Sequence, residues 1–439
     1  MIETLKNAFK IKDIRNRILF TFFILVVVRA GCQFPVPGVN HDVVSNFMSS
    51  NTGDAFNFFN AITGGSFAEF ALFALNITPY ITASIIMQLL TIAIPKLEEL
   101  QKDGEDGRKI IAQITRYVTV ALALIESIAM SIGFRNQGLF KNDNWQSIVL
   151  CVATLTAGSA VLMWLGERIT EKGIGNGISI VLTINIISSL PGDLMTVYER
   201  FVQSASIAMK VVSVIVILAL MVAMVVFTVL LQEAQRKIPV QYAKKMQGRK
   251  MMGGQSSHIP LKVNTAGVIP VIFASSILSF PVVIAQFFNV DYSTIGGKIL
   301  LTLNSSNWCR PEQPIYSIGF LIYAVLIILF AYFYTSITFN PVEVATNMKK
   351  QGGFILGVRP GKPTSEYLTR ILNYIILIGA IGLLIVCAVP IIISGVFNVS
   401  RLSFLGTSLI IIVGVVLETL KQIESLMAVR SYRGFLNNM

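Results

Sequence analysis

The chain has 439 residues, of which 54% are hydrophobic and only 13% are charged, and its mean hydropathy is +0.69. Soluble domains carry about 25% charged residues, so this composition excludes a soluble globular protein and indicates one that crosses a membrane several times. The formal net charge of +12 is informative only once the charges are placed in loops. The first apolar run leads directly into more protein, so we expect no cleaved signal peptide.

Ten apolar segments predict ten transmembrane helices, and hence an all-α polytopic membrane protein. The strongest segment, 211–231, contains no charged residue, and the weakest, 176–190, is short and begins within GIGNGISI. In chain order the segments are 18–34, 76–94, 111–133, 146–165, 176–190, 210–231, 265–288, 315–335, 368–390 and 404–420.

The second apolar stretch, residues 61–94, is interrupted twice. Gly64 and Gly65 break its start, and Asn76 and Pro79 break its middle. Non-helical backbone at membrane depth is tolerated only where it is buried in protein or lines a cavity. The stretch therefore predicts a half-helix, a polar break and a full helix beside an internal cavity.

The loop charges predict the orientation. Loops on the side of the termini hold 25 Lys and Arg residues, and loops on the opposite side hold 6. By the positive-inside rule both termini are cytoplasmic, which requires an even number of spans. Ten spans divide into an N-terminal half (1–190) and a C-terminal half (210–439), joined by an external linker (191–209). Two halves of five spans enter the membrane from opposite sides, which predicts inverted repeats around a central site.

Few residues are suited to catalysis. His41 and His258 lie in loops on opposite sides of the membrane, and no nucleophile–base set or phosphate-binding motif occurs. Gly173, Gly175 and Gly177 lack the spacing of a dinucleotide fingerprint and predict a tight turn between two spans. We therefore expect no enzymatic activity, no cofactor and no metal site.

Charges inside a membrane span are costly and usually functional, and the candidates here are Arg29, Arg116 and Glu126. Arg29 and Arg116 are within reach of a membrane end, so either snorkelling or a functional role fits them. Glu126 is deeper and needs a polar partner, for which Thr82 and Asn264 are candidates. An ion-coupled transporter usually has more acidic residues at this depth, and their scarcity counts against that class.

Two cytoplasmic loops, 232–263 and 336–367, are long, basic and rich in Gly and Pro. Their length and charge favour docking of a large anionic or acidic partner, of which RNA phosphate is one. The alternative is that they only set the orientation.

These segments resemble the SecY family, the channel subunits of the bacterial protein-conducting translocon, over essentially the whole chain. The resemblance is carried by FALNITPYITASIIMQLL (73–90), LMWLGERITEKGIGNGISI (162–180), QRKIPVQYAKKMQGRK (235–250), SSHIPLKVNTAGVIPVIFASSIL (256–278) and FNPVEVATNMKKQGGFILGVRPG (339–361). It implies two inverted five-helix halves around an hourglass pore, without catalysis by this chain.

The resemblance also implies a constriction formed by a ring of aliphatic side chains. The matching positions are Ile77, Ile81, Leu182, Ile272 and Ile411. From the residues alone each is an ordinary core aliphatic. A collar without hydrogen-bonding groups seals by dewetting.

A movable plug is implied at about residues 60–74. It includes Gly64, Gly65, Phe67 and Glu69. The alternative is a fixed re-entrant segment. A lateral gate is implied between the second and third spans on one side and the seventh and eighth on the other, with Thr82, Glu126 and Asn264 as its polar cluster.

The implied partners are SecE and SecG homologues, the SecA motor ATPase, the ribosome including its RNA, signal peptides and nascent chains, and membrane lipid. Arg249, Lys250 and Arg359 match docking positions for SecA and the ribosome. The implied location is the bacterial plasma membrane. Two rivals remain open: a secondary transporter with inverted repeats, which needs ionisable groups at mid-membrane, and a scaffold without a pore, which needs no aliphatic ring from both halves.

Overall fold

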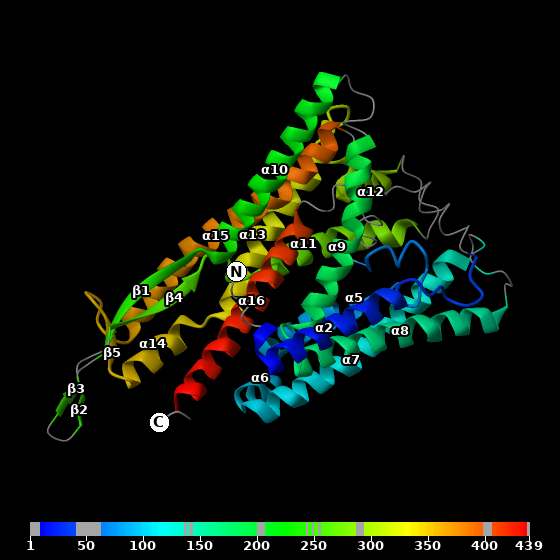
Figure 1. Ribbon diagram of the computed structural model, residues 1–439. Coiled ribbons are helices and arrows are strands. Elements are labelled where there is room, and N and C mark those ends of the chain that lie inside the picture. Colours follow the sequence, from blue (N-terminus) through cyan, green and yellow to red (C-terminus); the bar gives the residue numbers. More distant parts are fainter. Residues whose placement is uncertain are drawn as a thin grey trace.

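The computed structural model describes residues 9–40, 63–135, 138, 140, 144–199, 207–242, 245–247, 250–252, 256–286, 294–397 and 406–436. Within them, a long helix overlaps each of the ten predicted spans (Figure 1). These helices are α2 (Lys12–Gly31), α5 (Thr78–Ala93), α7 (Glu105–Arg135), α8 (Trp145–Lys172), α9 (Gly177–Tyr198), α10 (Ile207–Glu233), α11 (Ile269–Gln286), α13 (Ile318–Thr338), α15 (Lys362–Phe397) and α16 (Thr407–Leu436).

Six helical stretches among the described residues are long and apolar enough to cross a membrane, or seven if α5 and α6 (Pro95–Lys102) count as one bent span. The bend between α5 and α6 is 102° and falls at Pro95. Many large apolar side chains of α10 are exposed, including Ile215 and Val222 at 60% and 62%. Such a surface suits lipid and would be unstable in water. The structure is thus that of a membrane-embedded protein, and the count of ten spans stays a prediction.

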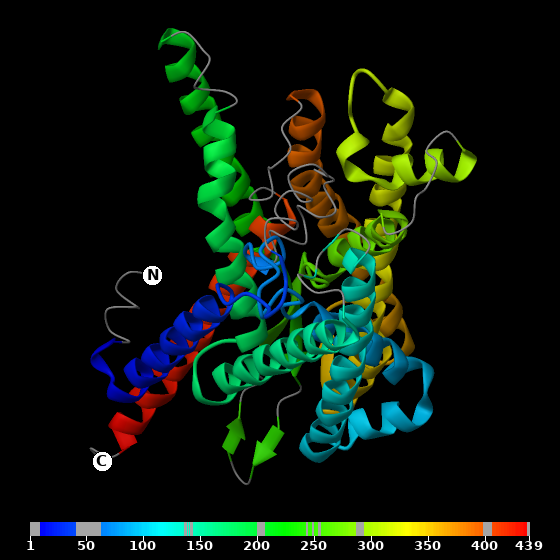
Figure 2. The same ribbon diagram turned by 90° about the vertical axis from the view of Figure 1, so that its right-hand side faces the viewer.

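The helices form two groups that converge (Figure 1; turned by 90° in Figure 2). The blue-to-cyan group contains α2, α5, α7 and α8, and the green-to-orange group contains α10, α13 and α15. In the first group, Ser127 and Thr156 bring their hydroxyl oxygens to 3.0 Å and tie α7 to α8. In the second, the rings of Phe273 and Phe330 stack at 5.2 Å and tie α11 to α13. Each group therefore has its own internal packing.

The two halves are joined along α9 and α16, which pack closely together. The turn before α9 contacts α16 directly, because the Gly175 N–H donates to Gln422 Oε1. Gly175 has φ +81°, and a Cβ there would meet Thr419 Oγ1 at 3.0 Å. Ile14, Ile174 and Ile423 bury a small apolar cluster beside this contact. The glycine cluster is thus the tight turn that its spacing predicts.

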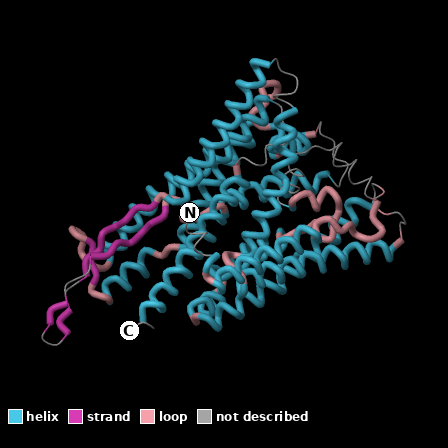
Figure 3. Tube along the Cα trace, in the orientation of Figure 1, coloured by secondary structure: helices cyan, strands magenta, loops and turns pink. Residues whose placement is uncertain are grey.

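Beyond the helices lies a small sheet, drawn in magenta at one end of Figure 3. Its strand order is β4 (Ser256–Lys262), β1 (Gln235–Tyr242), β5 (Gly353–Ile355), all antiparallel. A separate hairpin pairs β2 (Lys245–Gln247) with β3 (Lys250–Met252). The all-α prediction was therefore incomplete. The sheet unites the two basic loops, since β1 and β4 come from 232–263 and β5 from 336–367.

The sheet rests on the helices through its apolar face. Ile238 and Val240 of β1 and Ile355 of β5 are buried against Leu368 at the start of α15. The short helix α14 (Pro341–Lys350) lies between α13 and β5, and its N-cap Asn340 accepts hydrogen bonds from the Val342 and Glu343 N–H groups. The described strands of the two loops, together with α14, therefore form one platform.

Three further short elements and one boundary differ from the sequence prediction. The predicted linker 191–209 is helical at both ends, because α9 continues to Tyr198 and α10 begins at Ile207. The loop after α11 contains α12 (Ile295–Leu303), η2 (Ser305–Asn307) and η3 (Pro314–Ser317). The indole N–H of Trp308 donates to the Thr302 carbonyl at 2.7 Å and holds this loop against α12.

Candidate pore, plug and gate seam

The plug candidate is a chain of turns from residue 64 to 77, whereas the sequence predicted a half-helix over 60–74. Its residues 60–62 lie outside the described residues. Gly64, Gly65, Phe70 and Asn76 all have positive φ, which breaks the i to i−4 hydrogen-bond ladder of an α-helix. Pro79 does not interrupt a helix but sits in the first turn of α5, where proline is tolerated.

Internal hydrogen bonds make this segment compact. Ser66 Oγ lies 2.7 Å from the Thr63 carbonyl and 3.1 Å from the Phe73 carbonyl. The Val36 N–H donates to the Phe70 carbonyl at 3.1 Å, which ties the segment to the chain after α2. Phe70 is fully buried, with its ring edge-on to Phe134 of α7 at 5.8 Å between centroids. Of the four predicted plug residues, Gly64, Gly65 and Phe67 are half-buried and Glu69 is exposed.

The five predicted ring residues come from four helices. Ile77 caps α5 and Ile81 lies in its first turn, and both pack with Val181 of α9 in the core of the N-terminal half. Leu182 is on α9, Ile272 on α11 and Ile411 on α16.

Leu182, Ile272 and Ile411 share one property that sets them apart from their neighbours. None of the three belongs to the buried apolar clusters of the described residues. This holds even for Leu182 and Ile411, which are only 8% and 9% exposed. The residues preceding them, Val181, Val271 and Ile410, belong to those clusters. Consecutive helical residues point about 100° apart, so these three side chains project from a different helix face than the neighbours that form the cores of the two halves.

The predicted gate residues are distributed over three elements. Thr82 is half-buried on α5 and bonds back to the Thr78 carbonyl at 3.1 Å. Glu126 is half-buried on α7. Asn264 is buried between β4 and α11, and its Nδ2 has no hydrogen-bond partner in the described chain. No hydrogen bond joins the three among these residues, so the polar cluster stays a prediction.

α5 meets the C-terminal half along an apolar gap that we call the gate seam. The gap is lined by Ile85, Gln88 and Leu89 of α5, Phe273 of α11, and Phe330, Phe333, Tyr334 and Ile337 of α13. Within the described chain, α5 packs closely with α7 and α6 but not with α11 or α13. The seam is thus loosely packed, in contrast to the α9–α16 junction.

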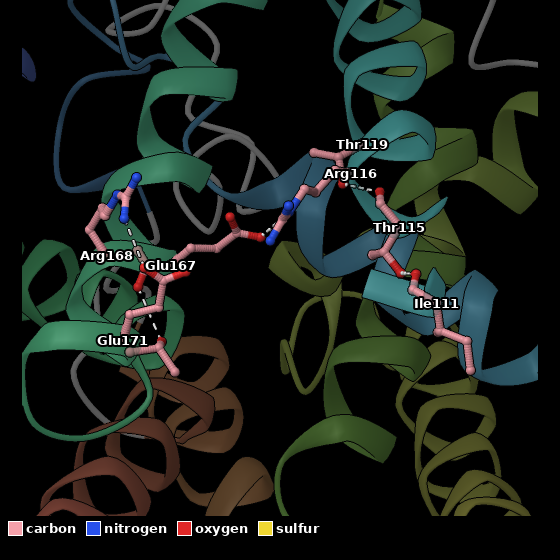
Figure 4. Close-up of polar contacts among 9 residues, drawn as sticks. Ile111, Thr115, Arg116, Thr119, Glu167, Arg168 and Glu171 are labelled. Carbon is pink, nitrogen blue, oxygen red and sulfur yellow. Dashed lines mark hydrogen bonds and ion pairs between the residues drawn. The ribbon is translucent and has the colours of Figure 1, made fainter. Parts of the chain in front are cut away.

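Arg116 is explained by a surface ion pair. Its Nε lies 2.7 Å from Glu167 Oε1, which links α7 to the C-terminal part of α8 (Figure 4). Arg168 and Glu171 form a second pair on α8, at 2.9 Å. Arg116 is exposed and belongs to neither the seam nor the ring. Its role is to hold two helices of one half together.

The docking candidates lie on the platform. Arg359 is exposed in the turn between β5 and α15, and its carbonyl accepts a 2.8 Å hydrogen bond from Thr364 Oγ1 that fixes the turn. Lys250 begins β3. Arg249 lies outside the described residues.

Sequence reasoning missed two features of the site. It did not predict the strands, although Ile238 and Val240 are two residues apart in QRKIPVQY, the spacing of one face of a strand. It also did not single out Asn185, a completely buried amide on α9. An asparagine within a predicted span was the available signal.

Two groups of apolar helices, joined along one side and loosely packed along the other, define the class of this protein. Two solved structures share the fold. A protein-conducting channel matches with a TM-score of 0.61 and 17% identity, over 94% of this chain and 92% of the other. The channel in a canine ribosome–channel complex from the endoplasmic reticulum matches with a TM-score of 0.58 and 16% identity, again over 94% and 92%. The fold is that of protein-conducting channels.

The family follows from sequence. The SecY family profile matches residues 71–420. The protein translocase subunit SecY of Halalkalibacterium halodurans is 43% identical over 442 residues, which cover 99% of this chain and 100% of that relative. The chain belongs to the SecY family. It is a membrane-embedded translocase subunit, and a secondary transporter is not favoured.

Proposed function

We propose that the chain forms a protein-conducting pore between its two halves. Unfolded secretory polypeptides pass through the ring of Ile77, Ile81, Leu182, Ile272 and Ile411. Transmembrane segments leave sideways through the gate seam. The ten spans form two inverted halves, and both termini face the cytoplasm of a bacterial plasma membrane.

The observation that carries this proposal is the unequal packing of the two junctions between the halves. α9 and α16 pack closely, whereas α5 faces α11 and α13 across an apolar gap. A two-part molecule opens where its contacts are fewest. The rim of that opening is apolar, which suits a transmembrane segment entering lipid.

The ring seals the pore without blocking it permanently. Its five side chains offer no hydrogen bonds to water, so a narrow passage between them dewets and resists ions. Aliphatic side chains rearrange easily, so the same ring accommodates polypeptides of different width. The turns within the predicted plug, residues 63–74 of the described chain, are the plug on one side of this ring, and they move aside when a chain enters.

The energy comes from partners that dock on the platform. The platform is basic, exposes Arg359 and carries Lys250 on its adjoining hairpin, and Arg249 precedes Lys250 in the sequence. The SecA motor and the ribosome are the proposed occupants, and the phosphates of ribosomal RNA are anionic groups that a basic surface attracts. SecE and SecG homologues complete the channel, and signal peptides, nascent chains and membrane lipid contact the seam.

Tethering the gate seam tests the proposal. Cysteines replacing Leu89 on α5 and Phe333 on α13 would be joined by a short thiol cross-linker, in a chain whose native cysteines are substituted. Because the seam must widen to admit a signal segment, we expect export and membrane insertion both to fall to the background of the assay. Each single cysteine treated with the same reagent should keep normal export.

The matched control places the tether inside one half, between cysteines replacing Ser127 and Thr156. Their hydroxyl oxygens already lie 3.0 Å apart, so joining α7 to α8 leaves the seam free. Full export through the Leu89–Phe333 tether would contradict the proposal.

A further inference from the structure

Arg29 lies in the last turn of α2 and points into the protein. Its Nη1 donates to the Gly64 carbonyl at 3.2 Å and approaches Asn185 Oδ1 at 3.5 Å. Snorkelling would instead place the guanidinium at the membrane surface. The side chain is half-buried, and no carboxylate pairs with it among the described residues. The Arg29 guanidinium therefore interacts with a backbone carbonyl and a side-chain amide.

The backbone conformation of Gly64 and its lack of a side chain permit this contact. It has φ +64°, a conformation in which any other residue is strained. A Cβ at this position would lie 2.6 Å from Arg29 Nη1, 2.8 Å from Ser188 Oγ and 2.9 Å from the Asn185 carbonyl. α2, α9 and the first residue of the plug turns thus converge within van der Waals distance.

Asn185 connects this contact to the ring. It is completely buried, and its Nδ2 has no partner in the described chain, so Oδ1 is the end of the amide that is satisfied here. Asn185 lies three residues after Leu182 on α9, which puts both on one face, one turn apart. Movement of the plug away from Arg29 would remove one of the two acceptors from a half-buried guanidinium.

We propose that Arg29 positions the plug in the resting channel, by holding the Gly64 carbonyl against α9. This inference rests on the proposed function and deepens it. Ser66 links the two ends of the plug segment through hydrogen bonds to the Thr63 and Phe73 carbonyls. A contact that holds the Gly64 carbonyl therefore restrains the whole segment. An entering chain that displaces the segment breaks one charge-assisted contact.

The test compares Arg29→Gln, Arg29→Lys and wild type in the full translocon, reconstituted in vesicles without a substrate. The readout is leakage of a small ion through the resting channel. Glutamine removes the charge and shortens the reach, so we expect leakage to rise roughly tenfold, as for loss of one charge-assisted hydrogen bond. Lysine keeps the charge and one donor nitrogen, and should restore most of the seal. Export of a precursor with a weakened signal should rise in parallel.

Two controls separate the possible failures. Arg116→Gln removes another helix-borne arginine, whose pair with Glu167 lies at the surface, and should leave leakage unchanged. Deletion of residues 64–70 should raise leakage if these turns seal the channel at all. High leakage on deletion with wild-type leakage in Arg29→Gln would overturn the role of Arg29 and leave the proposed function standing. Wild-type leakage in both would overturn the plug as well. Equal leakage in Arg29→Gln and Arg29→Lys would also count against the positioning contact.

Discussion

Asn264 is a buried amide in the gate that we propose. It is 6% exposed and its Nδ2 has no partner in the described chain. An unsatisfied buried donor costs about 1–3 kcal/mol, and this cost is present in the state seen here. A change of state that gives the amide a partner or water would relieve it. The residue therefore favours departure from this state.

Replacing Asn264 by Leu tests this effect. Leucine removes the unpaired donor, so the present state should gain stability and the seam should open less readily. We expect export of a precursor with a weak signal to fall about threefold or more relative to one with a strong signal. Asn373→Leu, at an exposed position of α15, is the matched control and should not change this ratio. Improved export of the weak signal would contradict the account.

Gly158 reports on the close approach of α8 to the plug turns. A Cβ at Gly158 would collide with the Leu72 carbonyl oxygen, which is backbone and cannot rotate away. Gly158→Ala should therefore lower stability by about 1–3 kcal/mol, the usual cost of overpacking. The measurement is the midpoint of thermal unfolding in detergent.

Gly192→Ala is the control for helix propensity. A Cβ at Gly192, in α9, meets nothing within 4 Å. The substitution should keep or slightly raise the midpoint, because alanine is the better helix former. A Gly158→Ala midpoint equal to that of Gly192→Ala would show that α8 has room to shift.

At the residue scale the sequence predicted some positions and missed others for physical reasons. A charge inside a span is visible in sequence, so Arg29, Arg116 and Glu126 were identified. Whether such a charge turns to the surface, as Arg116 does, or inward, as Arg29 does, depends on partners distant in the chain. The choice of Ile77, Ile81, Leu182, Ile272 and Ile411 among many aliphatics came from family resemblance, since composition cannot separate them.

At the scale of elements, the platform couples two distant loops. β1 pairs with both β4 and β5, with Val240 opposite Ile355. The turn after β5 then presents Arg359 next to α15. A partner that contacts Arg359 therefore acts next to the first turn of α15, a long helix of the C-terminal half, rather than on a free loop.

Arg359→Glu tests the docking role of this turn. Charge reversal on an exposed side chain should leave folding unchanged and should repel an acidic partner surface. We expect motor-driven export to fall at least tenfold, measured with purified motor and membrane vesicles. Lys362→Glu, three residues later and also exposed, carries the same charge change and should have a smaller effect. Intact motor-driven export in Arg359→Glu would refute the assignment.

The helices were predictable because apolar length alone identifies them, and each of the ten segments contains one. The strands were not, because QRKIPVQY is short, contains Pro239 and alternates over only a few residues. Its partner β5 is more than a hundred residues away, so the pairing has no local signature. The plug turns were missed because Phe70 and Asn76 adopt positive φ, a backbone conformation that cannot be read from the sequence.

At the scale of the whole molecule, the two halves act as units because each is tied internally. Ser127 and Thr156 fix α7 to α8, and the stacked Phe273 and Phe330 fix α11 to α13. In the function that we propose, motion is concentrated at the gate seam, and the α9–α16 junction stays closed. The loop charges predicted this division into halves but could not show which junction is tight.

The most direct test of the account asks where a moving polypeptide touches this chain. A photoreactive residue would replace Ile81, Ile272 or Ile411, one at a time, in a translocon that holds a stalled secretory chain. The account predicts cross-links from all three positions, which come from both halves, and none from Ile215 or Val222 on the exposed face of α10. Cross-links confined to one half, or equally strong at α10, would contradict a pore between the halves.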